Sequence, residues 1–433
     1  MTGPSQTVRM VRWPRVVLAG ACAFFAGCPV LSNLVSTYVA DGQSFAVTAA
    51  IAVSVLLALI VALVRIGLPA PAGQSMYGTI QLMVGVGALF WSHWILINLI
   101  SPSPQEQMHY QVLQAGIWLL APLAIFVIWR DWLDPYLVIR LLILLYAVFI
   151  IGLTLRWVLD LGFYQSGRWH AGKSLEAIRC GRYATLSLWV FAISLLCPPR
   201  VVSAHFKVVA ACCLPLSVLM MVAANARGPW LALAITLAVT SVPLSRLVFE
   251  RIRKDARILA GLGAGVLVVL VFVATQISRV QSDFDRLFTL TNDGGSAEGR
   301  ITLVHDHLHL LQVTPLAIVS GTGYGHGYFY PHNVLIEAMV NGGLLSLALL
   351  VTMIGITLYA WLWQSQRNDV ASLLFVGLFL LSLAGSEVSG SIASDLTWYF
   401  PLLVILTIVK GGRLVSTAND QRVHALPGAA AIP

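Results

Sequence analysis

Residues 46–64 read AVTAAIAVSVLLALIVALV, a run without a single charged side chain. An α-helix rises 1.5 Å per residue, so an apolar helix of about 20 residues crosses the ~30 Å hydrocarbon core of a bilayer. A membrane β-barrel would instead show short segments of alternating hydrophobicity. The uninterrupted run therefore predicts a membrane-spanning helix, which satisfies its backbone hydrogen bonds internally.

The rest of the chain has the same character. Of its 433 residues, 58% are apolar or aromatic and only 10% are charged, whereas a soluble domain has roughly 25% charged residues. Between Val16 and Trp129 the only formal charges are Asp41, Arg65 and Glu106. We therefore predict an all-α polytopic membrane protein with about twelve spans. The predicted spans lie near residues 16–38, 44–64, 77–100, 110–129, 137–158, 183–197, 206–224, 229–249, 258–277, 334–363, 370–386 and 396–409.

These spans divide the chain into four parts. Residues 1–277 hold helices one to nine, with an outer loop over 159–182, and residues 278–333 form a large outer loop. Residues 334–409 hold helices ten to twelve, and residues 410–433 form a tail. The basic start followed by an apolar stretch resembles a signal sequence, but that stretch is long enough for an uncleaved first helix.

The formal net charge of +8 comes from basic residues that flank the spans. They do not form one block or alternate with aromatic residues, so nucleic acid is not an expected partner. With the N-terminus inside, sixteen of the 26 Lys and Arg residues fall on the cytoplasmic side. This distribution follows the positive-inside rule, and both termini are expected in the cytoplasm.

Nine basic residues fall on the outer face, against the bias of membrane insertion. Either these are long solvated loops that translocate despite their charge, or the outer face holds an anion site. Guanidinium groups match phosphate oxygens bidentately, which favours such a site. The nine are Arg156, Arg168, Lys173, Arg179, Arg182, Arg227, Arg279, Arg286 and Arg300, while Arg140 is left inside a span.

Arg227 lies in the segment Asn225-Ala-Arg-Gly-Pro-Trp230, at the outer end of the eighth predicted span. Pro229 suits the first turn of a helix. The start of that helix would offer free backbone N–H groups and the positive end of its dipole to an anion beside Arg227. The alternative is an arginine whose side chain reaches the lipid headgroups.

The large outer loop contains a predicted amphipathic helix that begins at Arg300. Its apolar stripe either lies on the membrane or packs on the helix bundle. The stripe consists of Ile301, Val304, Leu308 and Leu311.

Two patterns in this loop are weak indications of a metal site. Of His305, His307 and His309, only the first and last share a helix face. Asp283-Phe-Asp285 matches a short motif of metal-dependent glycosyltransferases, but so short a pattern occurs by chance in long chains. We therefore predict no metal.

The loop ends with Gly321-Thr-Gly-Tyr-Gly-His-Gly-Tyr-Phe-Tyr-Pro-His332-Asn. The alternating glycines allow a tight backbone path and close approach of a ligand, but the Gly-Lys-Ser/Thr of a nucleotide phosphate loop is missing. Tyr324 and the following aromatic residues suit stacking on a sugar, or equally the anchoring of any membrane protein at the interface. A neutral His332 can remove a proton from an incoming hydroxyl near neutral pH, or it is an interfacial histidine without chemistry.

The combined pattern resembles the O-antigen ligase and polymerase superfamily of bacterial envelope enzymes. The resemblance rests on Gly299-Arg300, Gly321-Thr-Gly-Tyr-Gly325, His332-Asn333-x-Leu335-x-Glu337 and Gly342-Gly343. Arg227 is similar to the arginine that the ligases carry at the outer end of a middle span. Val304 departs from the pattern, because family members often have an aromatic residue one turn after the Gly-Arg pair.

The resemblance implies an inverting, metal-independent glycosyltransferase with a GT-C type fold and no cofactor. It implies a place in the inner membrane of a Gram-negative bacterium, with residues 278–333 and the active site in the periplasm. The donor would be undecaprenyl-diphosphate-linked O-antigen and the acceptor a sugar hydroxyl of lipid A-core, which makes lipopolysaccharide. His332 would act as the base or orient the acceptor hydroxyl. Arg227 and Arg300 would hold the diphosphate, and further substrate contacts would come from Arg179, Arg182, Arg168, Lys173, Tyr324 and Asn333.

Three other functions stay open. An O-antigen polymerase and a protein O-oligosaccharyltransferase share the resemblance, and the ligase is favoured because the large outer loop is compact and no soluble domain for a protein acceptor is evident. A lipid-linked polysaccharide transporter belongs to another class. Transporters tend to carry repeats and ionisable groups at mid-membrane, whereas this chain shows no clear repeat and only Arg140 as a candidate deep charge.

Overall fold

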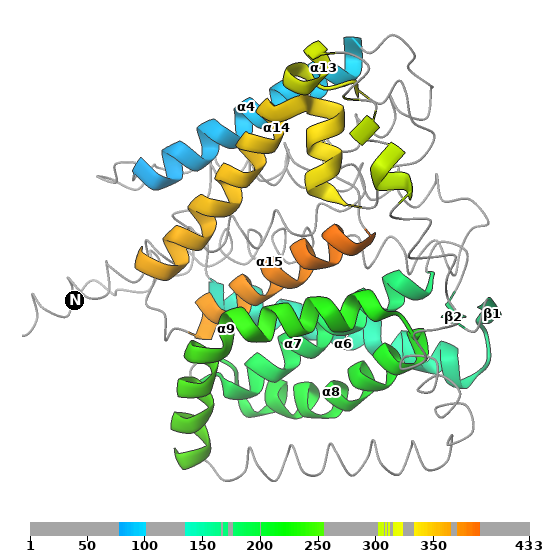
Figure 1. Ribbon diagram of the computed structural model, residues 1–433. Helices are drawn as coiled ribbons and strands as arrows, with labels where there is room; N and C mark the ends of the chain where they lie inside the picture. The colour runs from blue at the N-terminus through cyan, green and yellow to red at the C-terminus, as the bar shows by residue number, and fades with distance from the viewer. Residues whose placement is uncertain are drawn as a thin grey trace, which may run out of the picture.

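The computed structural model describes residues 78–100, 135–165, 168–171, 176–199, 201–254, 302–306, 308–309, 311, 315–323, 333–364 and 370–389. In these ranges the chain is an all-α membrane protein with one short β-hairpin (Figure 1). The predicted spans at 16–38, 44–64, 110–129, 258–277 and 396–409 lie wholly outside the described residues.

The helices are α4 (Gly78–Ile100), α6 (Pro135–Val158), α7 (Ala177–Leu196), α8 (Ala204–Ala224), α9 (Arg227–Lys254), α13 (Pro315–Ser320), α14 (Val334–Tyr359) and α15 (Val370–Ser389), with a π-helical turn η3 (Ala360–Gln364) after α14. The strands are β1 (Phe163–Gln165) and β2 (Arg168–His170). Within the described ranges, α6, α8, α9, α14 and α15 are long and apolar enough to cross a membrane, which confirms five of the predicted spans. α4 and α7 are helical over two more.

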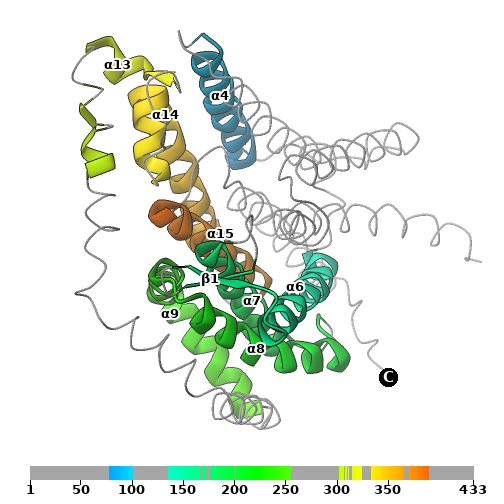
Figure 2. The same ribbon diagram turned by 90° about the vertical axis from the view of Figure 1, so that its right-hand side faces the viewer.

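The core of the described structure is a bundle of α6, α7, α8, α9 and α15 around α7 (Figures 1 and 2). Glycines allow its helices to approach closely. A side chain at Gly377 of α15 would meet the ring of Trp189 on α7, whose indole N–H donates to the Leu374 carbonyl at 3.0 Å. A Cβ at Gly181 of α7 would lie 2.9 Å from Cγ of Pro229 on α9. The starts of α7 and α9 are therefore in contact.

The outer segment that follows α6 is shorter and more ordered than the predicted loop over 159–182. β1 and β2 form an antiparallel hairpin that pairs Phe163 with His170 and Gln165 with Arg168. α7 then begins at Ala177 instead of near residue 183. Arg179 and Arg182 consequently lie in the first two turns of a helix, where their side chains have fixed directions.

A second group of helices consists of α4, α13 and α14. α4 runs beside the later part of α14 in both views (Figures 1 and 2). α14 is not one straight span, because Gly343 has non-helical dihedral angles of φ 68° and ψ −173°. Residues before and after this glycine run in different directions, as the sharp bend in Figure 1 shows.

The amphipathic helix predicted from residue 300 is helical where the structure describes it, over residues 302–306, 308–309 and 311. Of its apolar stripe, Leu311 is buried in a small cluster with Ala317 and Val340, whereas Leu308 is 37% exposed. Leu311 therefore packs on the protein, which is one of the two alternatives predicted for the apolar stripe.

Candidate functional site

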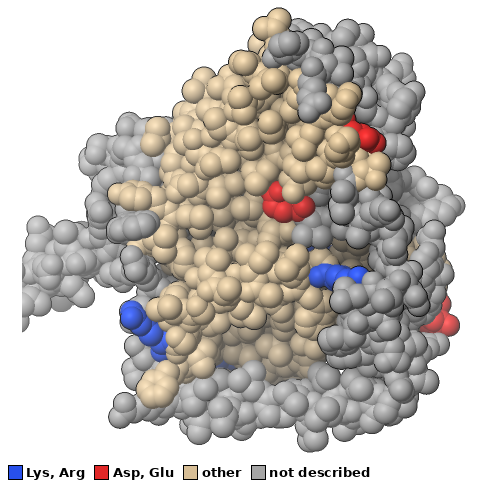
Figure 3. All heavy atoms as spheres, viewed as in Figure 1, with Lys and Arg blue, Asp and Glu red and all other residues tan. Residues whose placement is uncertain are grey.

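Four helix ends meet at the outer end of the bundle. In the predicted topology α7, α9 and α14 begin at the outer face and α15 ends there. Side chains join these ends across large sequence separations, from Arg182 on α7 to α15 and from Asn333 at the start of α14 to α15. Where Figure 3 shows described residues, the Lys, Arg, Asp and Glu side chains on that face are few and lie apart from one another. The ionisable groups at these four ends therefore form the candidate site.

Arg182 fixes the end of α15. Its Nη2 donates to the carbonyl oxygen of Ser382 at 2.9 Å and to Oγ of Ser386 at 2.6 Å. The side chain is only 7% exposed. A cation is favourable at the C-terminal end of a helix, where unsatisfied carbonyl groups carry partial negative charge. Arg182, which is predicted to contact a substrate, thus uses at least one of its nitrogens to support the fold.

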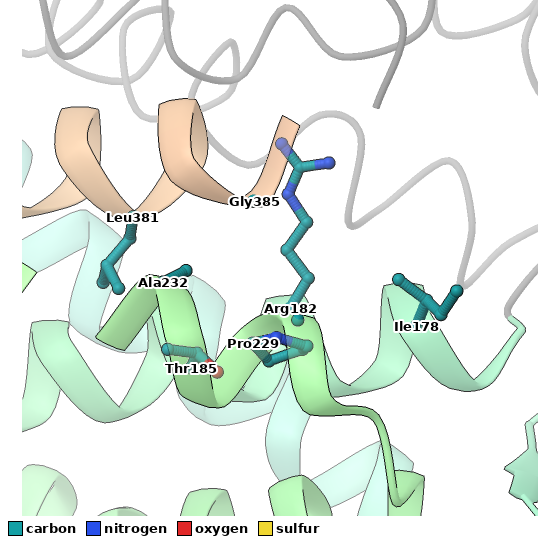
Figure 4. Close-up of a pocket in the computed structure, with 8 residues that line it drawn as sticks. Ile178, Arg182, Thr185, Pro229, Ala232, Leu381 and Gly385 are labelled. Atoms are coloured by element: carbon teal, nitrogen blue, oxygen red, sulfur yellow. The ribbon is translucent and has the colours of Figure 1, made fainter. Parts of the chain in front are cut away.

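A narrow pocket lies beside this arginine, between α7, α9 and α15. Figure 4 shows the Arg182 side chain extending past Gly385 toward the end of α15. Gly385 leaves room for it, since an added Cβ there would lie 3.0 Å from Arg182 Nε. Arg182 is the one charged residue of a lining that consists of Ile178, Arg182, Thr185, Gly228, Pro229, Ala232, Leu381 and Gly385.

Arg227 is the first residue of α9 and is exposed, as the sequence predicted for an arginine at a helix start. Pro229 lies in the first turn, which is also as predicted. Asn225 has left-handed dihedral angles (φ 47°), and this reversal lets α9 begin directly after α8 ends. Because Gly228 and Pro229 line the Arg182 pocket, the start of α9 lies beside it.

Arg179 lies one turn before Arg182 and faces a more open environment. Its Nε is 3.6 Å from Oε1 of Glu176, and the two side chains are 39% and 51% exposed. Solvent screens such a pair strongly, so it contributes little to stability. An arriving phosphate can compete for this guanidinium far more easily than for Arg182.

Several predicted site residues are not placed by the structure. Arg300, Tyr324, His332 and Lys173 lie outside the described residues, and Arg168 is described only as the backbone of β2. Within the described part of the chain, no group of three or more His, Cys, Asp or Glu side chains is arranged to hold a metal ion.

Arg140 is not a mid-membrane charge. Its Nε donates to the carbonyl oxygen of Val201 at 2.7 Å, in the turn between α7 and α8. This turn is at the opposite end of the bundle from the site, on the cytoplasmic side of the predicted topology. Arg140, the one candidate deep charge of the sequence analysis, thus lies in the second turn of α6 and bonds to the chain near that end of the bundle.

Asn333, the residue after His332, is used within the protein. Its Oδ1 accepts a hydrogen bond from the Ile336 N–H at 2.9 Å and so caps the start of α14. Its Nδ2 donates to the carbonyl oxygen of Glu387 at 3.2 Å. Asn333 therefore holds the start of α14 on the end of α15.

The glycine-rich segment contacts the bend of α14. The Thr322 N–H donates to the Val340 carbonyl at 2.8 Å. Gly321 and Gly343 both have left-handed φ values (82° and 68°), and a Cβ on either would meet backbone atoms of the opposite segment. The tight path predicted from the glycines is present at Gly321 and Gly323. The close approach that it allows is to the protein's own backbone.

Two contacting residues were missed by the sequence analysis. The ring Nε2 of His93 on α4 lies 2.9 Å from the Gly342 carbonyl oxygen at the bend. Glu387 lies at the end of α15, where its backbone and carboxylate contact the start of α14. For Glu387, the only signal in the sequence was its place as a lone acidic residue directly after a long apolar run.

Cys180, in the first turn of α7, is fully buried and is not a nucleophile. Burial raises the pKa of its thiol to about 12, so the reactive thiolate is not populated near neutral pH.

No model of a protein family matches the chain, and no curated protein sequence matches it. The resemblance to O-antigen ligases therefore rests on the motif residues themselves.

Proposed function

We propose that the protein is an O-antigen ligase, an inverting and metal-independent glycosyltransferase with a GT-C type fold of about twelve membrane helices. It joins undecaprenyl-diphosphate-linked O-antigen to lipid A-core at the periplasmic face of the inner membrane. His332 is the proposed base, Arg227 and Arg300 hold the diphosphate, and both termini lie in the cytoplasm.

One observation carries this proposal. The starts of α7 and α9, with Arg179 and Arg227, pack beside the end of α15, and the start of α14 is bonded to the same end through Asn333. His332 directly precedes Asn333 in the chain. Two sets of motif residues that are far apart in sequence thus belong to one end of the bundle.

The reaction follows from these groups. A hydroxyl oxygen of the acceptor attacks the anomeric carbon of the O-antigen, and the bond from that carbon to the diphosphate oxygen breaks. The hydroxyl proton passes to His332, and undecaprenyl diphosphate leaves with the electron pair of the broken bond. Direct attack inverts the anomeric centre. Arginines placed beforehand stabilise the diphosphate most in the transition state, where its charge increases.

The polymerase and the protein O-oligosaccharyltransferase would use the same groups with another acceptor. The compact loop over 278–333 favours the ligase among them. A lipid-linked polysaccharide transporter is the alternative of another class, and the chain shows no clear repeat of the kind that transporters tend to carry.

Purified full-length protein is mixed with lipid-linked O-antigen and lipid A-core in the presence of EDTA, and joined lipopolysaccharide is measured by gel electrophoresis. We expect product, and none from an inserted His332→Ala variant. Absence of wild-type product, or product only after a divalent metal is restored, contradicts the proposal. Elongated donor glycan without acceptor would indicate a polymerase, and glycosylated Ser or Thr peptides a protein transferase.

A further inference from the structure

The large outer loop has two halves of opposite composition. Residues 278–306 contain eight charged side chains, whereas residues 307–336 contain no Asp, Glu, Lys or Arg. In an ordinary soluble domain roughly a quarter of the residues are charged. The first half therefore has the composition of a loop in water, and the second half has that of a segment in contact with an apolar phase.

α13 belongs to this uncharged half, and it turns large apolar side chains outward. Leu316 is 78% exposed and Val319 is 60% exposed, while Ala317 between them is buried. A single exposed apolar residue is common on a protein surface, but neighbouring ones on one short helix mark a contact surface. Together with Ile318, which is also exposed, Leu316 and Val319 form the outward face of α13.

The last turn of α13 satisfies its carbonyl groups within the chain. Oγ of Ser320 donates to the Leu316 carbonyl at 3.0 Å, and the Gly321 N–H donates to the Ala317 carbonyl at 2.8 Å. A helix end in water can leave such carbonyls to the solvent, whereas an apolar surrounding requires that they are bonded internally. The backbone of α13 is therefore suited to an apolar surrounding.

α13 lies at the bend of α14, as both views show (Figures 1 and 2). A Cβ added at Gly343 would meet the carbonyl group of Val319. The straight part of α14 then begins with Leu344 and Leu345, which are 45% and 48% exposed. Because α14 is long and apolar enough to cross a membrane and starts at the outer face in the predicted topology, these leucines face the lipid of the outer leaflet. The outward face of α13 thus adjoins a surface that faces lipid.

A second copy of the chain fits this face less well than lipid does. A stable protein interface takes about 20–30 residues from each partner, whereas the outward face of α13 has three side chains. Lipid requires no matching shape. A helix that lies on a membrane buries its apolar face about 5–10 Å into the boundary between headgroups and acyl chains.

We propose that α13 is an interfacial helix and that Leu316, Ile318 and Val319 insert into the phospholipid of the outer leaflet beside α14. The uncharged half of the large outer loop is then held at the membrane surface, while the charged half stays in water. This inference concerns where the loop lies and does not depend on the ligase function.

The test measures the membrane depth of single side chains in full-length protein reconstituted into phospholipid nanodiscs. A fluorescent amino acid replaces Leu316 or, in separate proteins, Val351 in the straight part of α14 or Asp306 in the charged half of the loop. All three side chains are exposed, so the label has room. Its quenching is compared between lipids brominated early in the acyl chain and lipids brominated near the chain end.

We expect the label in place of Leu316 to be quenched most by the shallow bromines, because an interfacial helix lies only about 5–10 Å into the boundary. Val351 lies about 10 Å beyond Leu344 along the helix, so a label there should be quenched most by the deep bromines. A label in place of Asp306 should be quenched by neither. A label in place of Val319 should behave like the one in place of Leu316.

Leu316→Glu checks that apolar contact holds α13 in the lipid. A carboxylate is costly within a membrane, so a label in place of Val319 should lose its quenching by the shallow bromines. His305→Glu is the matched control, because it adds the same carboxylate at an exposed position of the charged half. The control should leave the quenching unchanged.

Three results overturn the inference. These are a label in place of Leu316 that neither lipid quenches, one that the deep bromines quench most, and shallow quenching at Val319 that survives Leu316→Glu. An unquenched label would mean that α13 lies in water or against another protein surface. Failure to fold with the label at either Leu316 or Val319 also contradicts the inference, because both side chains must be exposed to reach lipid. No substrate is present in these measurements, so a protein without ligation activity gives the same answer.

Discussion

α9 and α15 pack against each other and have nearly the same mean hydropathy, 1.8 and 1.9 in their most apolar windows, yet only 17% of the first window is buried against 83% of the second. α9 presents Leu231, Val242 and Phe249 outward, whereas α15 is enclosed on nearly all sides. Hydropathy therefore identifies a span but does not reveal its depth in the bundle.

The difference separates two kinds of arginine at the site. Arg227 begins the exposed helix and has an exposed side chain, while Arg182 bonds to the end of the enclosed helix and is 7% exposed. Removing the first should affect chemistry alone. Removing the second should affect chemistry and stability together.

The largest effect on transfer is expected for Arg227→Ala. Loss of a guanidinium that stabilises the leaving diphosphate should lower the ligation rate by about 100-fold or more. The thermal midpoint of the purified protein should stay within measurement error, because the side chain is exposed. A large drop in that midpoint would show that Arg227 supports the fold.

Arg182→Ala should lower both quantities. The end of α15 loses two hydrogen bonds from a charged donor, a loss of about 3 kcal/mol or more in stability. The ligation rate should fall because Glu387 and Asn333 depend on the same helix end. Arg246→Ala, which removes an exposed arginine of α9, is the control and should leave the thermal midpoint unchanged. Equal midpoints for both variants would contradict the bracing role of Arg182.

Gly377→Val tests the enclosed face of α15 without touching an ionisable group. The added side chain meets the Trp189 ring, and overpacking of this kind costs about 1–3 kcal/mol. The thermal midpoint should fall, and ligation at low temperature should fall less than in Arg182→Ala. A wild-type midpoint would mean that α7 and α15 separate easily.

The smallest effect is expected for Ala238→Val on the exposed face of α9. A membrane-facing position accepts one apolar residue in place of another, so the stability change should be within about 0.5 kcal/mol. A fall comparable to that of Gly377→Val would show that another surface covers this face of α9.

What the sequence predicts well here is local. The spans α6, α8, α9, α14 and α15 follow from apolar runs, and the start of α9 follows from Arg227 and Pro229. Each of these depends on neighbours within a few turns. The same locality explains why the early start of α7 was missed, since residues 177–182 read as a polar loop until their neighbours are known.

The contacts of the site are non-local. Arg182 and Ser386 are 204 residues apart in sequence, and His93 and Gly342 are 249 apart. No periodicity links such pairs, and helix packing alone decides them. Glu387 escaped notice for this reason, because its importance comes from the start of α14 and not from its own surroundings in the chain.

The bend at Gly343 also reconciles the length of α14 with the thickness of a bilayer. The apolar stretch from Val334 to Leu362 has 29 residues and as a straight helix would measure about 43 Å, well beyond a ~30 Å hydrocarbon layer. Residues 344–362 alone measure about 28 Å, which matches that layer without tilt. The first two and a half turns of α14 are therefore not required to cross the lipid layer, and they can lie across the outer end of the bundle. One glycine thus removes a hydrophobic mismatch and places the first part of α14 at the outer end of the predicted topology.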